Sequence, residues 1–206
     1  MGLFFKKIFI SRLVLALIVF TYFDAHPDHF ISDVTHMTFI LKKVSRGRIH
    51  NPLLLAKVIL KECRKYNLDP LLIVALIYQE SSFRSYASSH KSAIGLMQLK
   101  QSTAQEIAKK LKWGSFSKKD LLNPIKNVKL GIHYLAKLKK QFLNNKVLFL
   151  TAYNNGPART KSLCNMLSKN ELKFIYAKKV LRIYSSLKRN HLPSEFPVSM
   201  VVASKD

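Results

Sequence analysis

Residues 69–82 read DPLLIVALIYQESS, and this stretch decides the fold. Asp69 is a favoured helix N-cap residue and Pro70 suits the first helical position, so a helix is expected to begin here. Residues 71–78 are apolar on every side of that helix, which predicts that the helix lies in a protein core. Its polar end therefore brings the carboxylate of Glu80 to the border of that core.

The rest of the chain from residue 51 onward is also helical in its pattern. Before this stretch, apolar and aromatic residues recur every three or four positions, as on one face of a helix. They are Leu55, Ile59, Cys63 and Tyr66. Behind it, helices are expected from near Ser102 to Leu111, over 123–142, over 147–153, from Pro157 and over 172–187. No alternating strand pattern appears, so the predicted fold class is mainly α.

The segment 83–98 interrupts this series of helices. It is rich in Ser and carries Gly95, which favours a loop or short irregular strands. An irregular Ser/Gly-rich region is therefore predicted directly after the helix that ends near Glu80.

The N-terminus has the pattern of an export signal. Lys6, Lys7 and Arg12 precede the apolar run 13–23, LVLALIVFTYF, which resembles the basic and apolar regions of a secretory signal. The cleavage region after it is poor, because Phe23 stands where a small residue is expected. Residues 1–25 are therefore interpreted as a signal peptide or an uncleaved N-terminal signal anchor, and both interpretations export the remaining chain.

Three further segments complete the predicted organisation. Residues 26–50 are expected to be a linker or a peripheral segment that precedes the domain. The helical patterns define one domain over 51–189, which suits a chain of 206 residues. Residues 190–206 contain two prolines and are expected to form a loosely ordered C-terminal tail.

The charge of the chain indicates an anionic partner. Lys and Arg total 35 against 11 Asp and Glu, which gives a formal net charge of +24. Such a charge favours nucleic acid, a membrane surface or an anionic cell-wall polymer. No nucleic-acid-binding motif is present and the export signal argues against that partner, so no nucleic acid is expected.

The position of Glu80 by itself makes this residue a candidate general acid. The end of a helix carries partial negative charge and burial penalises an ionised carboxylate, and both effects raise the pKa of Glu80. A general acid that works near neutral pH requires such a raised pKa. The alternative for an isolated residue is an ordinary solvated glutamate at a helix end.

Several ordered blocks surround and follow Glu80. The first two are ESSF at 80–83 and the segment 87–98, which contains ASS and AIGLMQ. The block AYNNGP follows at 152–157, and Tyr176 lies farther on with Val180. In this combination, from about Asp69 to Leu187, the chain resembles the soluble lytic transglycosylase family, which is related in fold to goose-type lysozymes.

The resemblance implies a lysozyme-like transglycosylase domain over 51–189 that cleaves peptidoglycan glycan strands. Glu80 would protonate the glycosidic oxygen between N-acetylmuramic acid and N-acetylglucosamine. It would then act as base on the muramic 6-hydroxyl, which closes a 1,6-anhydro ring. The implied substrate-binding residues are Ser89, Met97, Gln98, Tyr153, Asn154 and Tyr176. Met97 has an alternative interpretation as a core residue.

The chain departs from the family's usual sequence at a few positions. Ser92 stands where Gly is usual before the alanine of the second block, and Lys100-Gln101 replaces a following Met-Pro. Leu172 and Lys173 fall where Glu-Thr is usual before the last tyrosine. These differences affect the predicted shape of the groove and the role of Tyr176.

The distribution of acidic residues is consistent with a mechanism that uses one carboxylate. Typical glycosidases need two carboxylates about 5–10 Å apart. After Glu80 the next acid is Glu106, in a predicted helix beyond the loop, while Asp120 and Glu171 lie near helix starts and suit capping. A lysozyme-type hydrolase, and an exported cationic protein that binds wall or membrane without cutting, are the alternatives.

No metal or organic cofactor is expected. The histidines and aspartates between residues 24 and 36 lack the spacing of metal ligands. Cys63 and Cys164 have no CxxC partner, and they are either paired in an oxidising compartment or two buried thiols. The predicted location is the bacterial cell envelope, as a periplasmic or membrane-anchored protein.

Overall fold

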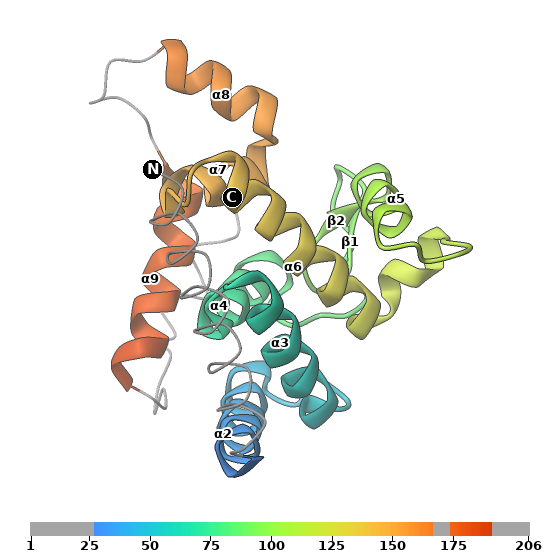
Figure 1. Ribbon diagram of the computed structural model, residues 1–206, viewed down its shortest axis with the longest axis vertical. Coiled ribbons are helices and arrows are strands. Elements are labelled where there is room, and N and C mark those ends of the chain that lie inside the picture. The colour runs from blue at the N-terminus through green and yellow to red at the C-terminus, as the bar shows by residue number, and fades with distance from the viewer. Residues whose placement is uncertain (1–26, 167–173, 191–206) are drawn as a thin grey trace, which may run out of the picture.

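The computed structural model describes residues 27–166 and 174–190, and within them the fold is mainly α, as predicted (Figure 1). The first helices are α2 (Pro27–Ser45), α3 (Pro52–Tyr66), α4 (Pro70–Ser81) and α5 (Gln101–Lys110). They are followed by the 3-10 helix η1 (Lys118–Leu122), α6 (Pro124–Gln141), α7 (Lys146–Asn155), α8 (Pro157–Met166) and α9 (Ile175–Asn190). The export signal predicted at 1–25 and the tail from 191 lie outside the described residues.

Helix α4 occupies the core, as the sequence predicts. The Asp69 side chain accepts a hydrogen bond from the backbone N–H of Leu71 at 2.9 Å, with Pro70 in the first turn. All residues from Leu72 to Ile77 are buried. Helix α9 packs along α4, and α3 packs between α2 and α6 (Figure 1). Helix α4 is consequently packed against α2, α3 and α9.

Asparagine caps begin three of the surrounding helices. The side chains of Asn51, Asn123 and Asn145 each accept a hydrogen bond from the backbone at the start of α3, α6 and α7. Proline follows the first two of these caps, which combines the two preferred N-terminal signals. The predicted helix starts at Asn123-Pro124 and near Val147 are therefore confirmed.

Residues 26–50, predicted to be a linker or a peripheral segment, consist mostly of a helix that packs on the domain. Helix α2 covers 19 of them, and Met37, Ile40, Leu41 and Val44 belong to the same hydrophobic core as α4. The linker interpretation is wrong for this helix. These apolar residues do recur with helical spacing, but the His and Asp residues interleaved through the first half of the helix obscure that pattern in the sequence.

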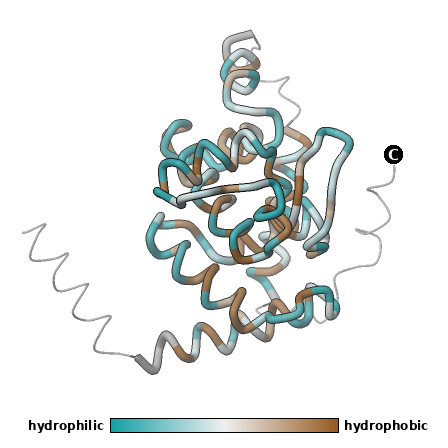
Figure 2. Tube along the Cα trace, turned by 90° about the vertical axis from the view of Figure 1, so that its right-hand side faces the viewer, coloured by the Kyte–Doolittle hydropathy of each residue, from teal (hydrophilic) through white to brown (hydrophobic). Residues whose placement is uncertain are grey.

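Along the helices the chain alternates between hydrophobic and hydrophilic residues, as expected for helices buried on one side (Figure 2). The predicted irregular region contains two short antiparallel strands, β1 (Ala93–Ile94) and β2 (Leu99–Lys100). Between residues 27 and 166, and again between 174 and 190, no helix is long and apolar enough to cross a membrane.

Candidate active site

Glu80 lies in the last turn of α4, and its carboxyl group is held by a residue from the far end of the domain. The hydroxyl of Tyr176, at the start of α9, donates a hydrogen bond to Glu80 Oε1. Burial raises the pKa of Glu80 to about 7, although the hydrogen bond from Tyr176 acts in the opposite direction. A carboxyl group with such a pKa can hold and release a proton near neutral pH.

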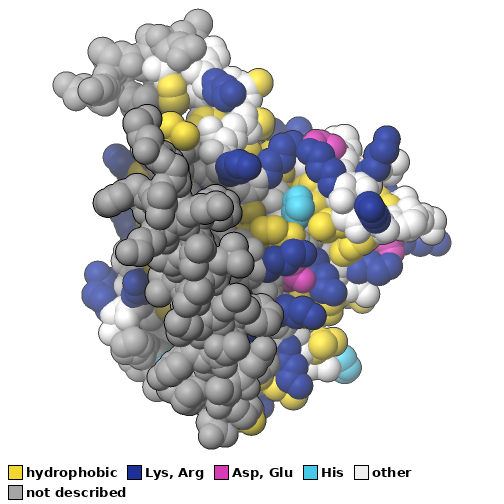
Figure 3. All heavy atoms as spheres, viewed as in Figure 1, with side chains coloured by type: hydrophobic (Ala, Val, Ile, Leu, Met, Phe, Trp, Pro, Cys, Tyr) yellow, Lys and Arg dark blue, Asp and Glu magenta, His cyan; other side chains and the backbone are white. Residues whose placement is uncertain are grey.

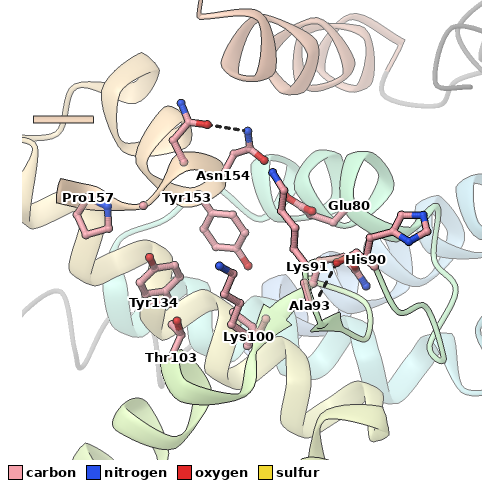
Figure 4. A pocket seen from close by; sticks show the side chains of 15 residues that line it. Glu80, His90, Lys91, Ala93, Lys100, Thr103, Tyr134, Tyr153, Asn154 and Pro157 are labelled. Atoms are coloured by element: carbon pink, nitrogen blue, oxygen red, sulfur yellow. Dashed lines mark hydrogen bonds between the residues drawn. The ribbon is translucent and has the colours of Figure 1, made fainter. Parts of the chain in front are cut away.

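The Glu80 side chain faces a pocket of about 580 Å³ between the irregular loop and helix α7 (Figure 4). On the loop side the lining includes Ser89, His90, Lys91, Ala93, Gln98, Leu99 and Lys100. On the helix side it includes Thr103, Tyr134, Tyr153, Asn154, Asn155, Gly156 and Pro157. The mixture of aromatic rings, amides and hydroxyls suits a carbohydrate, which presents both apolar ring faces and hydroxyl groups.

A second hollow of about 360 Å³ adjoins the first. The two share Asn154 and Asn155, and the second is also lined by Tyr176, Phe174 and Lys179. The Glu80–Tyr176 pair therefore lies between two neighbouring recesses. A polymer chain could occupy both recesses, with the bond to be cut near the carboxyl group.

Side chains at the end of α4 and in the loop fix the pocket wall. The hydroxyl of Ser81 donates to the carbonyl of Leu96 at 2.9 Å, which ties the loop to the helix that carries Glu80. Gln98 donates from Nε2 to the carbonyls of Ala87 and Gly95, both at 3.0 Å. These bonds use the amide of Gln98 within the protein, so this residue shapes the pocket as well as lining it.

Asn127 forms hydrogen bonds to the backbone of the same loop, and it was not among the predicted site residues. It is fully buried in α6, accepts from the backbone N–H of Met97 at 2.8 Å and donates to the carbonyls of Ile94 and Leu121. Gly95 has φ +82°, and an added Cβ would lie 2.3 Å from the Asn127 amide nitrogen. A polar residue on the otherwise apolar face of the predicted 123–142 helix is the signal that could have identified Asn127.

Met97 is predicted to line the sugar groove, and the structure corrects this. Its side chain is fully buried and does not line the pocket. A Cβ at Gly131 of α6 would lie 2.3 Å from the Met97 sulfur, so the methionine fits against a glycine in the core. The backbone of Met97 does contribute to the site, because its carbonyl accepts a 2.7 Å hydrogen bond from the hydroxyl of Tyr153.

The remaining predicted residues surround Glu80. Ser89, Gln98, Tyr153 and Asn154 line the larger pocket, and Tyr176 contacts the carboxyl group itself. The ring of Tyr153 is packed against Tyr134, with centroids 5.4 Å apart. Tyr134, Lys91 and Lys100 also line the pocket but were not predicted, because tyrosines and lysines are common throughout this chain.

Among the described residues, Glu80 is the one carboxylate that lines either recess. Glu106 is exposed on α5 and forms ion pairs with Lys110 at 2.9 Å and Lys137 at 2.8 Å, which lower its pKa to about 2. Asp120 closes a capping box with Ser117 at the start of η1, as its predicted capping role requires. Glu171 lies outside the described residues.

The described residues contain no group of His, Cys, Asp and Glu that could hold a metal ion. Both cysteines are free thiols, and Cys63 is buried in α3, where burial raises its pKa. The structure therefore favours unpaired thiols over a disulfide, but only Cys63 is buried, since Cys164 is partly exposed.

A mainly helical domain with a largely buried acid at the end of a core helix, facing a pocket, is typical of the lysozyme-like class of protein. The family model described as "Transglycosylase SLT domain" matches residues 57–172, and the chain belongs to this family. The match includes Glu80, the loop, the pocket and Tyr153.

Curated relatives carry the same family's names. The chain is 31% identical over 144 residues to membrane-bound lytic murein transglycosylase C of Sodalis glossinidius, covering 66% of this chain and 40% of the relative. It is 32% identical over 142 residues to the protein of that name from Histophilus somni, covering 63% of this chain and 39% of the relative. The chain thus spans about 40% of the length of these relatives.

Solved structures of lytic transglycosylases have the same fold. An inactive Glu-to-Gln variant of Slt from Pseudomonas aeruginosa aligns with a TM-score of 0.59 at 29% identity, over 71% of this chain and 26% of that one. The 70-kDa soluble lytic transglycosylase of Escherichia coli aligns with a TM-score of 0.59 at 20% identity, over 78% of this chain and 32% of that one.

Proposed function

We propose that this chain is a peptidoglycan lytic transglycosylase, a carbon–oxygen lyase that cuts glycan strands with Glu80 as its single general acid and base. The observation that carries the proposal is the buried Glu80 carboxyl, with a pKa of about 7 and a hydrogen bond from Tyr176, in a pocket with no second carboxylate among the described residues. Family membership supports the same activity.

The proposed reaction has two proton transfers, both at Glu80. Protonated Glu80 donates its proton to the glycosidic oxygen, and the bond between that oxygen and C1 of N-acetylmuramic acid breaks. The carboxylate that remains then accepts the proton of the muramic 6-hydroxyl while O6 bonds to C1. The 1,6-anhydro ring is closed, Glu80 is protonated again, and no water is consumed.

The environment of Glu80 suits both steps. Burial keeps the proton on Glu80 up to about pH 7, so the acid form is available for the first step. The hydroxyl of Tyr176 donates to one carboxyl oxygen and stabilises the anion that the first step creates. Ser89, Gln98, Tyr153 and Asn154 are proposed to position the sugars, because they line the pocket around this carboxyl.

The product of the reaction tests this proposal. The full chain is incubated with purified sacculi, and the released muropeptides are analysed by mass spectrometry. The expected products end in 1,6-anhydromuramic acid and are one water lighter than products of hydrolysis. Reducing ends would instead identify a lysozyme-type hydrolase, and the absence of any release would favour a cationic protein that binds the wall without cutting.

We further propose that the chain acts in the bacterial cell envelope. The proposal rests on the basic and apolar pattern of residues 1–25 and on the membrane-bound relatives. Cell fractionation and N-terminal sequencing of the mature protein test it. An intact N-terminus on protein in the membrane fraction would indicate an anchor. A new N-terminus near His26 would indicate that the signal has been removed. Full-length protein in the cytosol would contradict export.

A further inference from the structure

Two lysines stand at the pocket on the loop side, opposite helix α7. Lys91 lies in the turn that precedes β1, and Lys100 is the last residue of β2. Both side chains are exposed and both line the same pocket as Glu80 (Figure 4). The short β1–β2 pair brings the two positions together, since Ala93 and Lys100 are direct partners in its register.

Neither ammonium group is used within the part of the chain that the structure describes. The ion pairs there involve Lys110, Lys126 and Lys137, and no hydrogen bond joins Lys91 or Lys100 to another side chain. Other lysines of this chain do bind acids within the protein: Lys137 donates a hydrogen bond to Glu106, and Lys126 donates one to Asp120. Two unpaired cations in one pocket wall are therefore available to a ligand.

The charge of the pocket is strongly one-sided. Glu80 is the one acidic residue among the lining residues described, and its pKa of about 7 leaves it largely uncharged in mildly acidic solution. The chain as a whole is also basic, with 35 Lys and Arg against 11 Asp and Glu, and the described part of the face in Figure 3 shows many Lys and Arg side chains and few acids. A neutral sugar chain alone gives no reason for two cations at this position.

The substrate of the proposed function does carry negative charge. N-acetylmuramic acid bears a lactyl ether whose carboxyl group is ionised where no peptide is attached. Where a peptide is attached, that group is a neutral amide and the peptide supplies carboxylates of its own. We propose that Lys91 and Lys100 form a carboxylate-binding site for the acidic substituent of a muramic acid residue. This inference rests on the proposed function and extends it, because it makes the enzyme selective for charged, muramic-acid-containing glycan over neutral glycan.

Equilibrium binding tests the site separately from catalysis. The full chain carrying Glu80→Gln is titrated with untreated sacculi and with sacculi whose carboxylates have been converted to neutral amides. Exposed ion pairs contribute little individually, so we expect about three- to tenfold tighter binding to the untreated material. The double substitution Lys91→Met and Lys100→Met should abolish that preference, while Lys91→Arg with Lys100→Arg should retain it.

A matched control separates a site from the general charge of the protein. Lys57→Met with Lys61→Met removes the same two charges from the exposed side of α3, which lines neither recess. The control should keep the preference for untreated sacculi. If both Met pairs lose it equally, or if the pocket pair keeps it, the proposal is overturned.

A third preparation identifies the source of the carboxylate. Hydrolysis of the amide bonds that join the peptides to the glycan frees the lactyl carboxylates and removes the peptide carboxylates. Lysine-dependent binding to the resulting strands would assign the site to the lactyl group, and its loss would assign the site to the peptide. Release of muropeptides by the unsubstituted chain is measured in parallel. Lack of release would refute the proposed function, whereas the dependence of binding on the two lysines decides the present inference.

Discussion

The end of α4 and the outer face of α5 each carry a glutamate, and the two environments shift its pKa in opposite directions. Glu80 is held against Tyr176 in a largely buried position, which raises its pKa to about 7. Glu106 is exposed between Lys110 and Lys137, which lower its pKa to about 2. In a chain with 35 basic residues, the second environment is the ordinary one.

The comparison shows what keeps an acid protonated near neutral pH in a highly basic protein. Lysines near a carboxylate stabilise its anion, so an acid on the surface of this chain is ionised and cannot donate a proton near neutral pH. Burial raises the pKa of Glu80 instead, and the hydrogen-bond partner of its carboxyl group is an uncharged hydroxyl rather than an ammonium group. The apolar helix α4 thus supports the proposed role of Glu80 as well as forming part of the core.

The largest expected effect separates the two glutamates by activity. Glu80→Gln keeps the size of the side chain but cannot transfer a proton, so the rate of muropeptide release should fall by at least about 10²–10⁴-fold. Glu106→Gln should retain most of the activity, because Glu106 lines neither recess. Circular dichroism of both variants checks that they are folded. Substantial activity in Glu80→Gln would refute the assignment of the acid.

The next effect concerns stability. Glu80→Gln, which lowers activity, should make the folded protein more stable at neutral pH. The folded pKa of Glu80 lies above its unfolded value of 4.5, so the folded chain keeps a proton that the unfolded chain loses as pH rises. The free energy of unfolding should therefore fall by about 3 kcal/mol between pH 4.5 and pH 7 on account of this group.

Denaturant unfolding at a series of pH values measures this contribution. In the Glu80→Gln variant the decline should be absent, so the variant should gain stability relative to the unsubstituted protein as pH rises to 8. Parallel stability curves for the two proteins would show that Glu80 is not held in its protonated form by the fold.

A smaller effect distinguishes the two tyrosines near the acid. Tyr176→Phe removes the hydrogen bond that stabilises ionised Glu80, so the pKa of Glu80 should rise, and the alkaline limb of the activity profile should move to higher pH. Activity should fall by about 10- to 100-fold, as expected for the loss of a hydrogen bond to a charged group. Rate measurements across pH check both outcomes, and an unchanged profile would contradict them.

Tyr153→Phe serves as the companion variant. Its hydroxyl donates to the buried carbonyl of Met97, so its loss should cost about 1–3 kcal/mol of stability and leave the alkaline limb in place. A shift of the limb with this variant as well would mean that both hydroxyls act on the carboxyl group.

The smallest expected effect is the loss of the ion pairs at Glu106. Its folded pKa is depressed, so its contribution to stability is present above pH 4.5 and is lost as the pH falls toward 2. Because the group is exposed, solvent screening limits that contribution to less than about 1 kcal/mol. Glu106→Gln should therefore change the unfolding free energy at pH 7 only slightly, and added salt should diminish the difference. A loss of several kcal/mol would mean that α5 depends on these pairs.

Local sequence determined much of this protein. Asp69-Pro70 and the all-apolar run behind it specify a buried helix by capping and by burial of apolar surface, and both causes operate within a few residues. The same stretch identifies Glu80 as the candidate acid, because a carboxyl group at the end of a buried helix is expected to have a raised pKa. The helix starts at Asn51, Asn123 and Asn145 are likewise set by their own side chains.

Tertiary structure alone decided how distant segments meet. Tyr176 reaches Glu80 only because α9 packs on α4, and the buried amide of Asn127 holds a loop some 30 positions earlier in the chain. Met97 lies in the core because Gly131 leaves space for its sulfur, although its sequence block implies a groove residue. These contacts depend on close packing between helices, in which the shape of one side chain is matched to a neighbour far along the chain, and no local pattern records that match.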